Sequence, residues 1–554
     1  MAVKRFWAAF ALSLLLMLGI ASACAADLDE VFHLHCEGVE MAPSFKNNRY
    51  HLFLPGTWMD GREITMRSEK AIWINGDEYQ SGDPLPAFEN GDTWTICIGK
   101  RNYQPSTVQL HIGSDLPALF IRTASGSLAA IHADKEKKEL ADYALFDPDE
   151  ETESGALEYI KGRGNTTFAH PKKPYQIKFT EKKALCGMDE AKKWVLLADY
   201  WDISLLRNRI TLDLAEAAGM RYTPDCTHVD LYLNGKYRGL YLLTEKIEIG
   251  EHSVDIRDLQ KATEKMNLQV LSSYPVEQLE KKKGDDTGEF LALRGYTGVK
   301  NPSDITGGYL LETDKLHRFY EDTYSGFITG KSMAVAVKEP ENATMEMVLY
   351  VGEIVNAFHR AILTEDGVDP QTGKRWDDLF DKESLAQKYL IEEYSENYDA
   401  MLGSQYFYKE PDSVSDKIFS GPCWDYDLTY GNAQHTPNRL YLRAFEDGHE
   451  EYWYNHLHLF EDFEVLVQSM WRDTFSPLAN ALAGNTESPA IRSVTEYGEE
   501  IRHLAEMNFV LWTIKSIEGR HKETGHNFQS AIDMLEEYAG RRAAWLDQSF
   551  APEE

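Results

Sequence analysis

The sequence is poor in basic residues and in cysteine, and it has no apolar run long enough to cross a bilayer. Only 57 of its 554 residues are Lys or Arg, against 90 Asp or Glu, so the formal net charge is -33. A surface with this excess of negative charge repels nucleic acid and anionic membranes. We therefore expect neither a nucleic-acid partner nor a transmembrane span.

The six cysteines do not have the spacing of a zinc or redox centre, because no two of them form a short Cys-x-x-Cys pair. Cys36 and Cys97 fall in neighbouring segments that have the pattern of strands. Two interpretations stay open for this pair. They form a disulfide, as in many exported proteins, or they are unpaired buried thiols.

The first 26 residues have the pattern of a secretory signal peptide. Lys4 and Arg5 precede an apolar run over residues 6–20, which small residues follow. This run is too short for a stable membrane span. We expect its removal and export of the protein to the cell surface or the extracellular space. A lipid anchor on Cys24 is the less favoured alternative, because Ala21 stands where a Leu is usual.

The chain is long enough for about three to four domains, since a typical domain has roughly 100 to 200 residues. Residues 27–115 alternate apolar and polar positions between turn signals, most clearly over 50–54, 71–76 and 93–98. Short strands at this spacing favour a small all-β, sandwich-like accessory domain.

A glycine-rich turn follows, made of Gly162, Arg163, Gly164 and Asn165. Glycine permits close approach of the backbone, and the donor groups beside it suit a phosphate. The alternative is an ordinary surface turn, which this motif forms more often.

The next segment, 172–180, alternates as a strand and places Tyr175, Ile177 and Phe179 on one face and Lys178 on the other. Two interpretations of Lys178 stay open: it is a polar residue on a solvent-exposed face of the strand, or it binds nucleotide phosphates as a point charge.

Further along, residues 204–218 have helical spacing, and Arg207 near the start reaches either a phosphate or a surface salt-bridge partner. Asn234-Gly235 between two apolar segments is the strongest hairpin signal of the chain. Residues 260–304 predict a solvated insertion around a lysine triplet. Beyond residue 343 the pattern becomes mainly helical.

Three aspartates are the candidates for chemistry. Asp425 and Asp427 lie among aromatic and small residues, and Asp399 precedes them in an Asn-Tyr-Asp motif. An unpaired charge in such surroundings is costly and usually has a function, although a single such Asp is also compatible with a structural acid. The order of these features matches that of the parts of a protein kinase: a glycine turn, a strand lysine, a helix, a hairpin and two aspartate motifs. The usual kinase motifs His-Arg-Asp and Asp-Phe-Gly are absent.

Six segments together resemble the spore-coat protein H (CotH) kinase family. They are KGRGNTTF, KKPYQIKF, KWVLLADYWDISLLRNRI, DLYLNGKYRGLYLLTEKIEI, ENYDAMLGSQYFYKE and GPCWDYDLTYGN. They occur in family order between about residues 116 and 431. The resemblance therefore predicts a kinase-like domain over 116–436, with the insertion at about 260–304 and a helical C-terminal extension over 437–554.

The resemblance implies an α+β fold with a two-lobed, atypical protein kinase-like domain. Its N-lobe would be an antiparallel sheet and its C-lobe mainly helical, preceded by the small all-β domain. It also implies ATP and Mg²⁺ or Mn²⁺ as cofactors, with these residues in family roles: Asp399 and Lys178 catalytic; Gly162, Arg163, Gly164, Asn165, Lys178 and Arg207 cofactor-binding; and Asp425, Asp427 and Ser404 at the metal.

The leading functional hypothesis is an exported Ser/Thr protein kinase that moves the γ-phosphate of ATP to a protein hydroxyl. Ser404 departs from the kinase pattern, which has an Asn five residues after the catalytic Asp to help hold the second metal. Two alternatives stay open: a non-catalytic surface or assembly protein, and a nucleotidyl transferase. The acidic net charge further predicts a protein substrate that is basic around its Ser or Thr acceptor.

Overall fold

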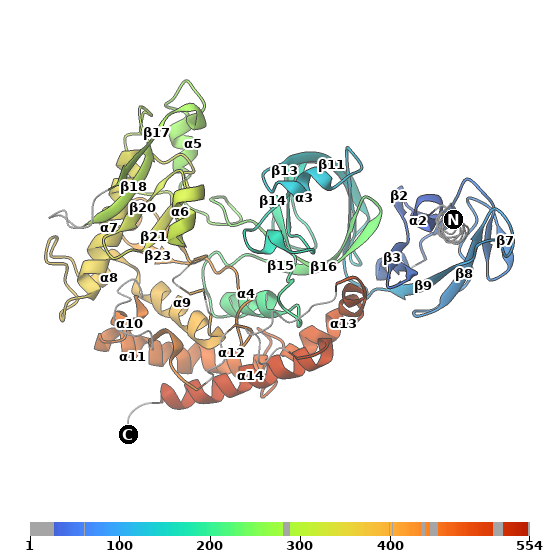
Figure 1. Ribbon diagram of the computed structural model, residues 1–554. Coiled ribbons are helices and arrows are strands. Elements are labelled where there is room, and N and C mark those ends of the chain that lie inside the picture. Colours follow the sequence, from blue (N-terminus) through green and yellow to red (C-terminus); the bar gives the residue numbers. More distant parts are fainter. Residues whose placement is uncertain are drawn as a thin grey trace, which may run out of the picture.

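The computed structural model describes residues 27–551, except for 60, 281–288, 398, 401–402, 434–437, 444–452 and 513–524. The expected signal peptide with Cys24 and the lysine triplet at 281–283 lie outside the described residues. The fold is mixed α+β, as the sequence predicts. Figure 1 shows the N-terminal strands on one side of a central barrel, a larger sheet on the other side, and long C-terminal helices beneath.

The N-terminal strands form two sheets that share one apolar core. The sheets are β2-β1-β5 and β3-β4-β9-β8-β6-β7. Their bounds are β1 His33–Cys36, β2 Val39–Met41, β3 Ser44–Lys46, β4 Arg49–Leu54, β5 Thr65–Arg67, β6 Ile72–Ile74, β7 Asp77–Tyr79, β8 Thr93–Ile98 and β9 Ser106–Ile112, after the short helix α2 Leu28–Val31. Cys36 and Cys97 are both buried and free, so the structure shows the unpaired thiols and no disulfide between them.

The core of this region continues into the barrel. Phe120 of the barrel stacks on Trp58 with ring centroids 5.3 Å apart and on Tyr232 at 4.2 Å. The Tyr232 hydroxyl donates to the carbonyl of Phe53 across 3.0 Å. The accessory region is therefore packed on the barrel by buried aromatic rings, each of which removes a large apolar area from water.

The barrel is closed, in the strand order β10-β11-β12-β13-β14-β16-β15. Its bounds are β10 Ala118–Thr123, β11 Lys138–Phe146, β12 Glu153–Gly162, β13 Tyr175–Lys183, β14 Ala191–Leu197, β15 Cys226–Leu233 and β16 Lys236–Glu245, with the short helix α3 Ala129–Ala133 after β10. The sequence predicts an antiparallel sheet here. The structure corrects this, because β10 pairs in parallel with β15 and so joins the two edges.

The local predictions in this region are confirmed. Asn234 and Gly235 both have positive φ, 50° and 73°, as a tight hairpin between β15 and β16 requires. The helix predicted over 204–218 is α4, Arg207–Ala217, and Gly219 follows it with a φ of 79°.

A second sheet lies on the side of the barrel away from the N-terminal strands (Figure 1), and the sequence does not predict it. Its order is β17-β18-β20-β21-β19-β22-β23. The bounds are β17 Val276–Glu280, β18 Phe290–Tyr296, β19 Tyr309–Asp314, β20 Gly326–Thr329, β21 Ala334–Glu339, β22 Tyr406–Lys409 and β23 Ile418–Ser420. The solvated insertion expected over 260–304 is thus wrong in part, because β18 has a buried apolar face that includes Phe290 and Leu293.

Helices cover this sheet and form the rest of the chain. Their bounds are α5 Leu259–Glu264, α6 Leu316–Asp322, α7 Met345–Ile362, α8 Trp376–Leu379, α9 Lys382–Ser395, α10 Tyr454–Leu457, α11 Glu461–Met470, α12 Ser476–Leu482, α13 Val494–Leu511 and α14 Phe528–Ser549. The mainly helical pattern predicted beyond residue 343 includes α9, and the side chain of Asp381 caps this helix by accepting from the amide of Ser384. Among the helices of the described residues, none combines the length and apolar character that crossing a membrane requires.

The barrel interior contains one acid at its end. Glu245 follows Tyr241 and Leu243 at intervals of two, so its side chain shares their interior face. Glu245 is 4% exposed, and its Oε1 has no hydrogen-bond partner among the described residues. Burial, together with the charges of Asp225 and Asp189, raises the pKa of Glu245 to about 8.

We predict that Glu245→Gln stabilises the protein increasingly as pH rises from about 4.5 to about 8. In this window the folded wild type keeps the proton that the unfolded chain releases, so wild-type stability falls with pH, by at most about 1.4 kcal/mol per pH unit. Urea unfolding of both proteins at several pH values measures this difference. The control is Glu251→Gln, an exposed acid 3.5 Å from Lys182. Parallel pH profiles of wild type and Glu245→Gln would contradict the prediction.

Candidate functional site

The loop after β23 carries Asp425 and Asp427, and hydrogen bonds from three directions fix its backbone. The amide of Tyr426 donates to Asn208 Oδ1 of α4 across 2.7 Å. The Arg207 guanidinium donates through Nε to the carbonyl of Thr429 across 2.9 Å. The amide of Tyr430 donates to the carbonyl of Ser395, at the end of α9, across 2.7 Å. Helices α4 and α9 therefore determine where the two aspartates lie.

Arg207 itself is fully buried. It forms an ion pair with Asp202, which also accepts from the amide of Arg207 across 2.8 Å. All of its recorded contacts go to Asp202, Ser204 and loop carbonyls. These contacts give Arg207 a structural role beneath the loop, and nothing in them favours the phosphate contact expected from the sequence.

A second buried network lies under the same loop. Lys388 of α9 donates to the Tyr426 hydroxyl across 2.7 Å, and that hydroxyl donates to Glu392 Oε1 across 2.7 Å. Lys388 and Glu392 also form an ion pair at 2.5 Å, and both side chains are fully buried. Burial lowers the pKa of Lys388, but Cys423 and Glu392 outweigh this effect and raise it above its ordinary value. Lys388 therefore stays charged inside the core.

Asp425 is at the centre of the site. Its side chain reaches solvent although protein surrounds it on most sides, and it accepts from the Ser404 hydroxyl across 3.0 Å. Desolvation by the surrounding protein and the charge of Asp399 raise the pKa of Asp425, whereas Ser404 and Arg163 act against this rise. Its φ of 69° lies in the left-handed region, which Asp and Asn tolerate better than most residues. The structure thus brings together four of the residues that the sequence singles out.

Asp427 lies deeper, with 8% of its surface exposed. Burial raises its pKa, and so do the charges of Asp425, Asp199, Asp202 and Asp399, in that order. No ion pair reaches Asp427 within the described part of the chain. Four other aspartates thus act on Asp427, and most of them have a basic neighbour.

Asp199 and Lys172 belong to this cluster, and the sequence analysis misses both. Asp199 accepts from the Asn208 amide nitrogen across 2.8 Å. Burial raises the pKa of Asp199 and lowers the pKa of Lys172, and each charge moderates the shift of the other. Lys172 lies over the Tyr241 ring at 4.7 Å. The sequence offers two adjacent lysines at 172 and 173, and no local signal separates the buried one from its neighbour.

The predicted glycine turn contributes one side chain to the cluster. The guanidinium of Arg163 lies 5.4 Å from the centre of the Trp424 ring, next to Asp425. Gly164 has a φ of 82°, and a Cβ there would be 2.4 Å from Thr167 Oγ1, so the turn requires glycine. A Cβ on Gly162 would clash with Phe168 at 2.3 Å. Asn165 is exposed and accepts from Lys135 across 2.9 Å.

Lys178 lies elsewhere on the outer face of β13. Its ammonium pairs with Glu158 of the neighbouring strand at 2.6 Å, and both side chains are partly exposed. No recorded contact within the described residues joins Lys178 to Asp399, Asp425 or Asp427. The role expected for Lys178 stays a prediction from the sequence.

Other basic groups do reach the cluster, from the second sheet. Lys315 follows β19 directly, and its ammonium is 3.2 Å from Asp399 Oδ1. Lys338 of β21 pairs with Glu312 of β19 at 2.9 Å, and Glu312 influences the pKa of both Arg163 and Asp425. Residues 312–315 form a charged run at the end of an apolar segment, but this pattern does not indicate a contact with Asp399.

The described residues contain no group of three or more His, Cys, Asp or Glu side chains arranged to hold a metal ion. A cation that is bound here by one or two carboxylates needs further oxygen ligands. Mg²⁺ fits this condition, since it is commonly bound by one or two carboxylates together with phosphate oxygens and water.

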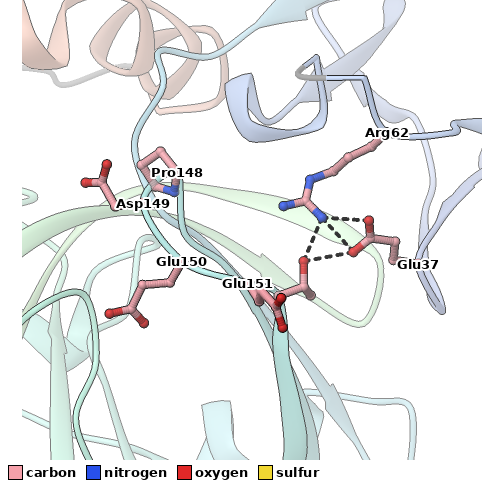
Figure 2. Close-up of a pocket in the computed structure, with 7 residues that line it drawn as sticks. Glu37, Arg62, Pro148, Asp149, Glu150 and Glu151 are labelled. Atoms are coloured by element: carbon pink, nitrogen blue, oxygen red, sulfur yellow. Dashed lines mark hydrogen bonds and ion pairs between the residues drawn. The ribbon is translucent and has the colours of Figure 1, made fainter.

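A separate depression lies between the N-terminal strands and the barrel. Figure 2 shows its wall, where Arg62 points toward Glu37 and several acids of residues 149–151 surround the opening. The depression has a volume of about 600 Å³, and Arg62 is held by Glu37 and by Thr152 at 2.7 Å. None of its lining residues belongs to the aspartate cluster.

Comparisons with known proteins agree with the sequence motifs. Residues 160–546 match the family model described as CotH kinase protein. Inner spore coat protein H of Bacillus subtilis (strain 168) is 24% identical over 276 residues, which cover 50% of this chain and 59% of that protein. The matched segment thus spans less than two thirds of that relative.

We predict that Lys388→Met destabilises the protein by about 3–5 kcal/mol, because it leaves Glu392 buried without its ion-pair partner. Lys382→Met on the same helix is the matched control. Its ammonium is partly exposed and 3.7 Å from Asp462, so we expect a change of at most about 1 kcal/mol. Chemical unfolding measures both, and equal effects of the two substitutions would contradict the prediction.

Proposed function

Because this chain belongs to the CotH kinase protein family, we propose that it is a kinase-like enzyme that transfers the γ-phosphate of ATP to a protein hydroxyl. The observation that supports this most directly is the grouping of Asp399, Ser404 and Arg163 around the solvent-accessible carboxylate of Asp425. The proposal includes a two-lobed kinase-like arrangement, with the barrel as one lobe and the second sheet with its helices as the other.

The residues present fit a divalent cation shared with phosphates. Asp425 is accessible to solvent, and Asp427 beneath it has no ion-pair partner among the described residues, so both retain carboxylate oxygens for a hard cation. When bound, the cation would neutralise charge on the phosphate oxygens. Ser404 would orient Asp425, and Arg163 would add positive charge from the side of the barrel.

Asp399 is the proposed proton acceptor. Its carboxylate would accept the proton of the substrate hydroxyl while the hydroxyl oxygen bonds to phosphorus and the bond from phosphorus to the ADP oxygen breaks. Most of the rate in such a transfer comes from alignment and charge neutralisation, so none of these groups needs an unusual pKa. The fixed backbone of the Asp425 loop supplies that alignment.

Labelled ATP separates this function from its alternatives. The purified protein is incubated with Mg²⁺ or Mn²⁺ and a serine-rich basic substrate. Movement of the γ-phosphate supports the kinase, and movement of the α-phosphate supports a nucleotidyl transferase. If neither label moves and ATP with metal leaves the melting temperature unchanged, the protein is a non-catalytic surface or assembly protein.

Location is part of the same proposal. The relative is a spore coat protein by name, and residues 1–26 have the signal-peptide pattern, so we propose that the chain is exported to a surface. Mass spectrometry of the mature N-terminus tests this, and an intact residue 1 on the functional protein would contradict it.

We predict that Asp425→Asn lowers the metal-dependent transfer rate by about 100-fold or more, because it removes the accessible charge that holds the cation. Asn keeps the size of the side chain and also tolerates the left-handed backbone. The control is Asp416→Asn, an exposed acid 3.5 Å from Lys374. Full activity of Asp425→Asn would remove this residue from the mechanism.

We also predict faster phosphorylation of basic than of acidic peptides at low salt. With a net charge of -33 the protein attracts a basic substrate, and added salt screens that attraction. Initial rates for a matched peptide pair at about 0.02 and 0.2 M salt measure the effect. Equal rates at both salt concentrations would contradict electrostatic steering.

A further inference from the structure

Lys315 occupies a distinctive position in the site. It is the residue between β19 and α6, and its ammonium contacts Asp399 Oδ1 at 3.2 Å. The Lys315 side chain is 36% exposed and that of Asp399 is 21% exposed, so the pair lies at the boundary between protein and solvent. A ligand that enters from solvent can therefore reach both groups.

The pair has a consequence for Asp399. While the Lys315 ammonium contacts Asp399 Oδ1, that oxygen is engaged and is less accessible to a substrate hydroxyl. Partly exposed ion pairs of this kind contribute little to stability, so a stronger acceptor can draw the ammonium away. The terminal phosphate of a nucleoside triphosphate is such an acceptor, since it carries several negative oxygens.

The basic side chains around the aspartate cluster differ in how freely they can move. The Lys172 ammonium is buried and Arg163 lies against Trp424. Lys315, in contrast, is on a flexible four-carbon stem with three rotatable donors, which can contact a carboxylate and a phosphate oxygen together.

We propose that Lys315 binds the terminal phosphate of the nucleotide and rests on Asp399 when no nucleotide is present. Movement of the ammonium to the phosphate would release Asp399 to accept the substrate proton. The inference rests on the proposed function of the site, and it names a catalytic residue that the family motifs do not include. The alternative is an ion pair that only anchors α6.

The test compares ATP, ADP and AMP binding to the full chain by isothermal titration calorimetry with Mg²⁺. We expect Lys315→Met to weaken ATP binding by about 10- to 100-fold, the worth of a charge-assisted hydrogen bond, with ADP and AMP binding changed less than about twofold. Arg318→Met is the matched control on α6, since Arg318 contacts Asp314 at 3.7 Å, and it should leave all three affinities unchanged.

Other outcomes overturn the inference. Equal losses for ATP and ADP, or no loss for ATP, mean that Lys315 does not contact the terminal phosphate. If Lys315→Met lowers the melting temperature strongly, Lys315→Gln and Lys315→Arg are measured, and only Lys315→Arg should retain the preference for ATP. A wild-type protein that binds no nucleotide refutes the proposed function itself. If the wild type transfers phosphate and the Lys315 variants bind nucleotides as the wild type does, the role of Lys315 alone is refuted.

Discussion

The buried ion pair between Arg207 and Asp202 is the interaction on which the site depends. It fixes the start of α4, and the same guanidinium extends to the carbonyls of Thr429 and Tyr430 in the aspartate loop. A buried charge without a partner costs several kcal/mol, so the pair and its acceptors have to be assembled together. The loop therefore cannot shift without exposing or isolating a charge. This constraint keeps several aspartates close together in spite of their mutual repulsion.

Helix α9 also fixes the aspartate loop through buried charged side chains, from the side opposite α4. It carries Lys388, Glu392 and Glu393 into the core, where they contact Tyr426, Arg542 and the amides of Tyr441 and Leu442. Such contacts contribute little net stability compared with an apolar core, but they are highly directional. Apolar packing holds the sheets and helices together, and buried charges set the position of the loop.

The sequence predicts the local elements well, because their signals are local. Asn234-Gly235 predicts a hairpin, and the apolar spacing of residues 204–218 predicts α4. The second sheet has no such signal, since β19 pairs with β21 and with the distant β22. For the same reason Asp399, Asp425 and Arg163 could be predicted from motifs, whereas Lys315 could not, because its contact with Asp399 spans 84 residues. The strand pattern around Lys178 predicts which side chains share a face of the strand. It does not predict which of the two faces lies toward the site.

The parallel pairing of β10 with β15 also constrains the order in which the chain can fold. Residues 118–121 pair with residues 230–233, so β10 has only one of its two neighbours until more than a hundred further residues have been synthesised. The antiparallel neighbours β11 to β14 can pair earlier, but the barrel stays open at one edge until β15 and β16 arrive. Closure over such a sequence separation is slow, and it leaves an unpaired strand edge in the growing chain. Until β15 has been synthesised, the apolar surface of Phe120 that finally packs on Tyr232 therefore has only the N-terminal strands and Phe146 of β11 to cover it.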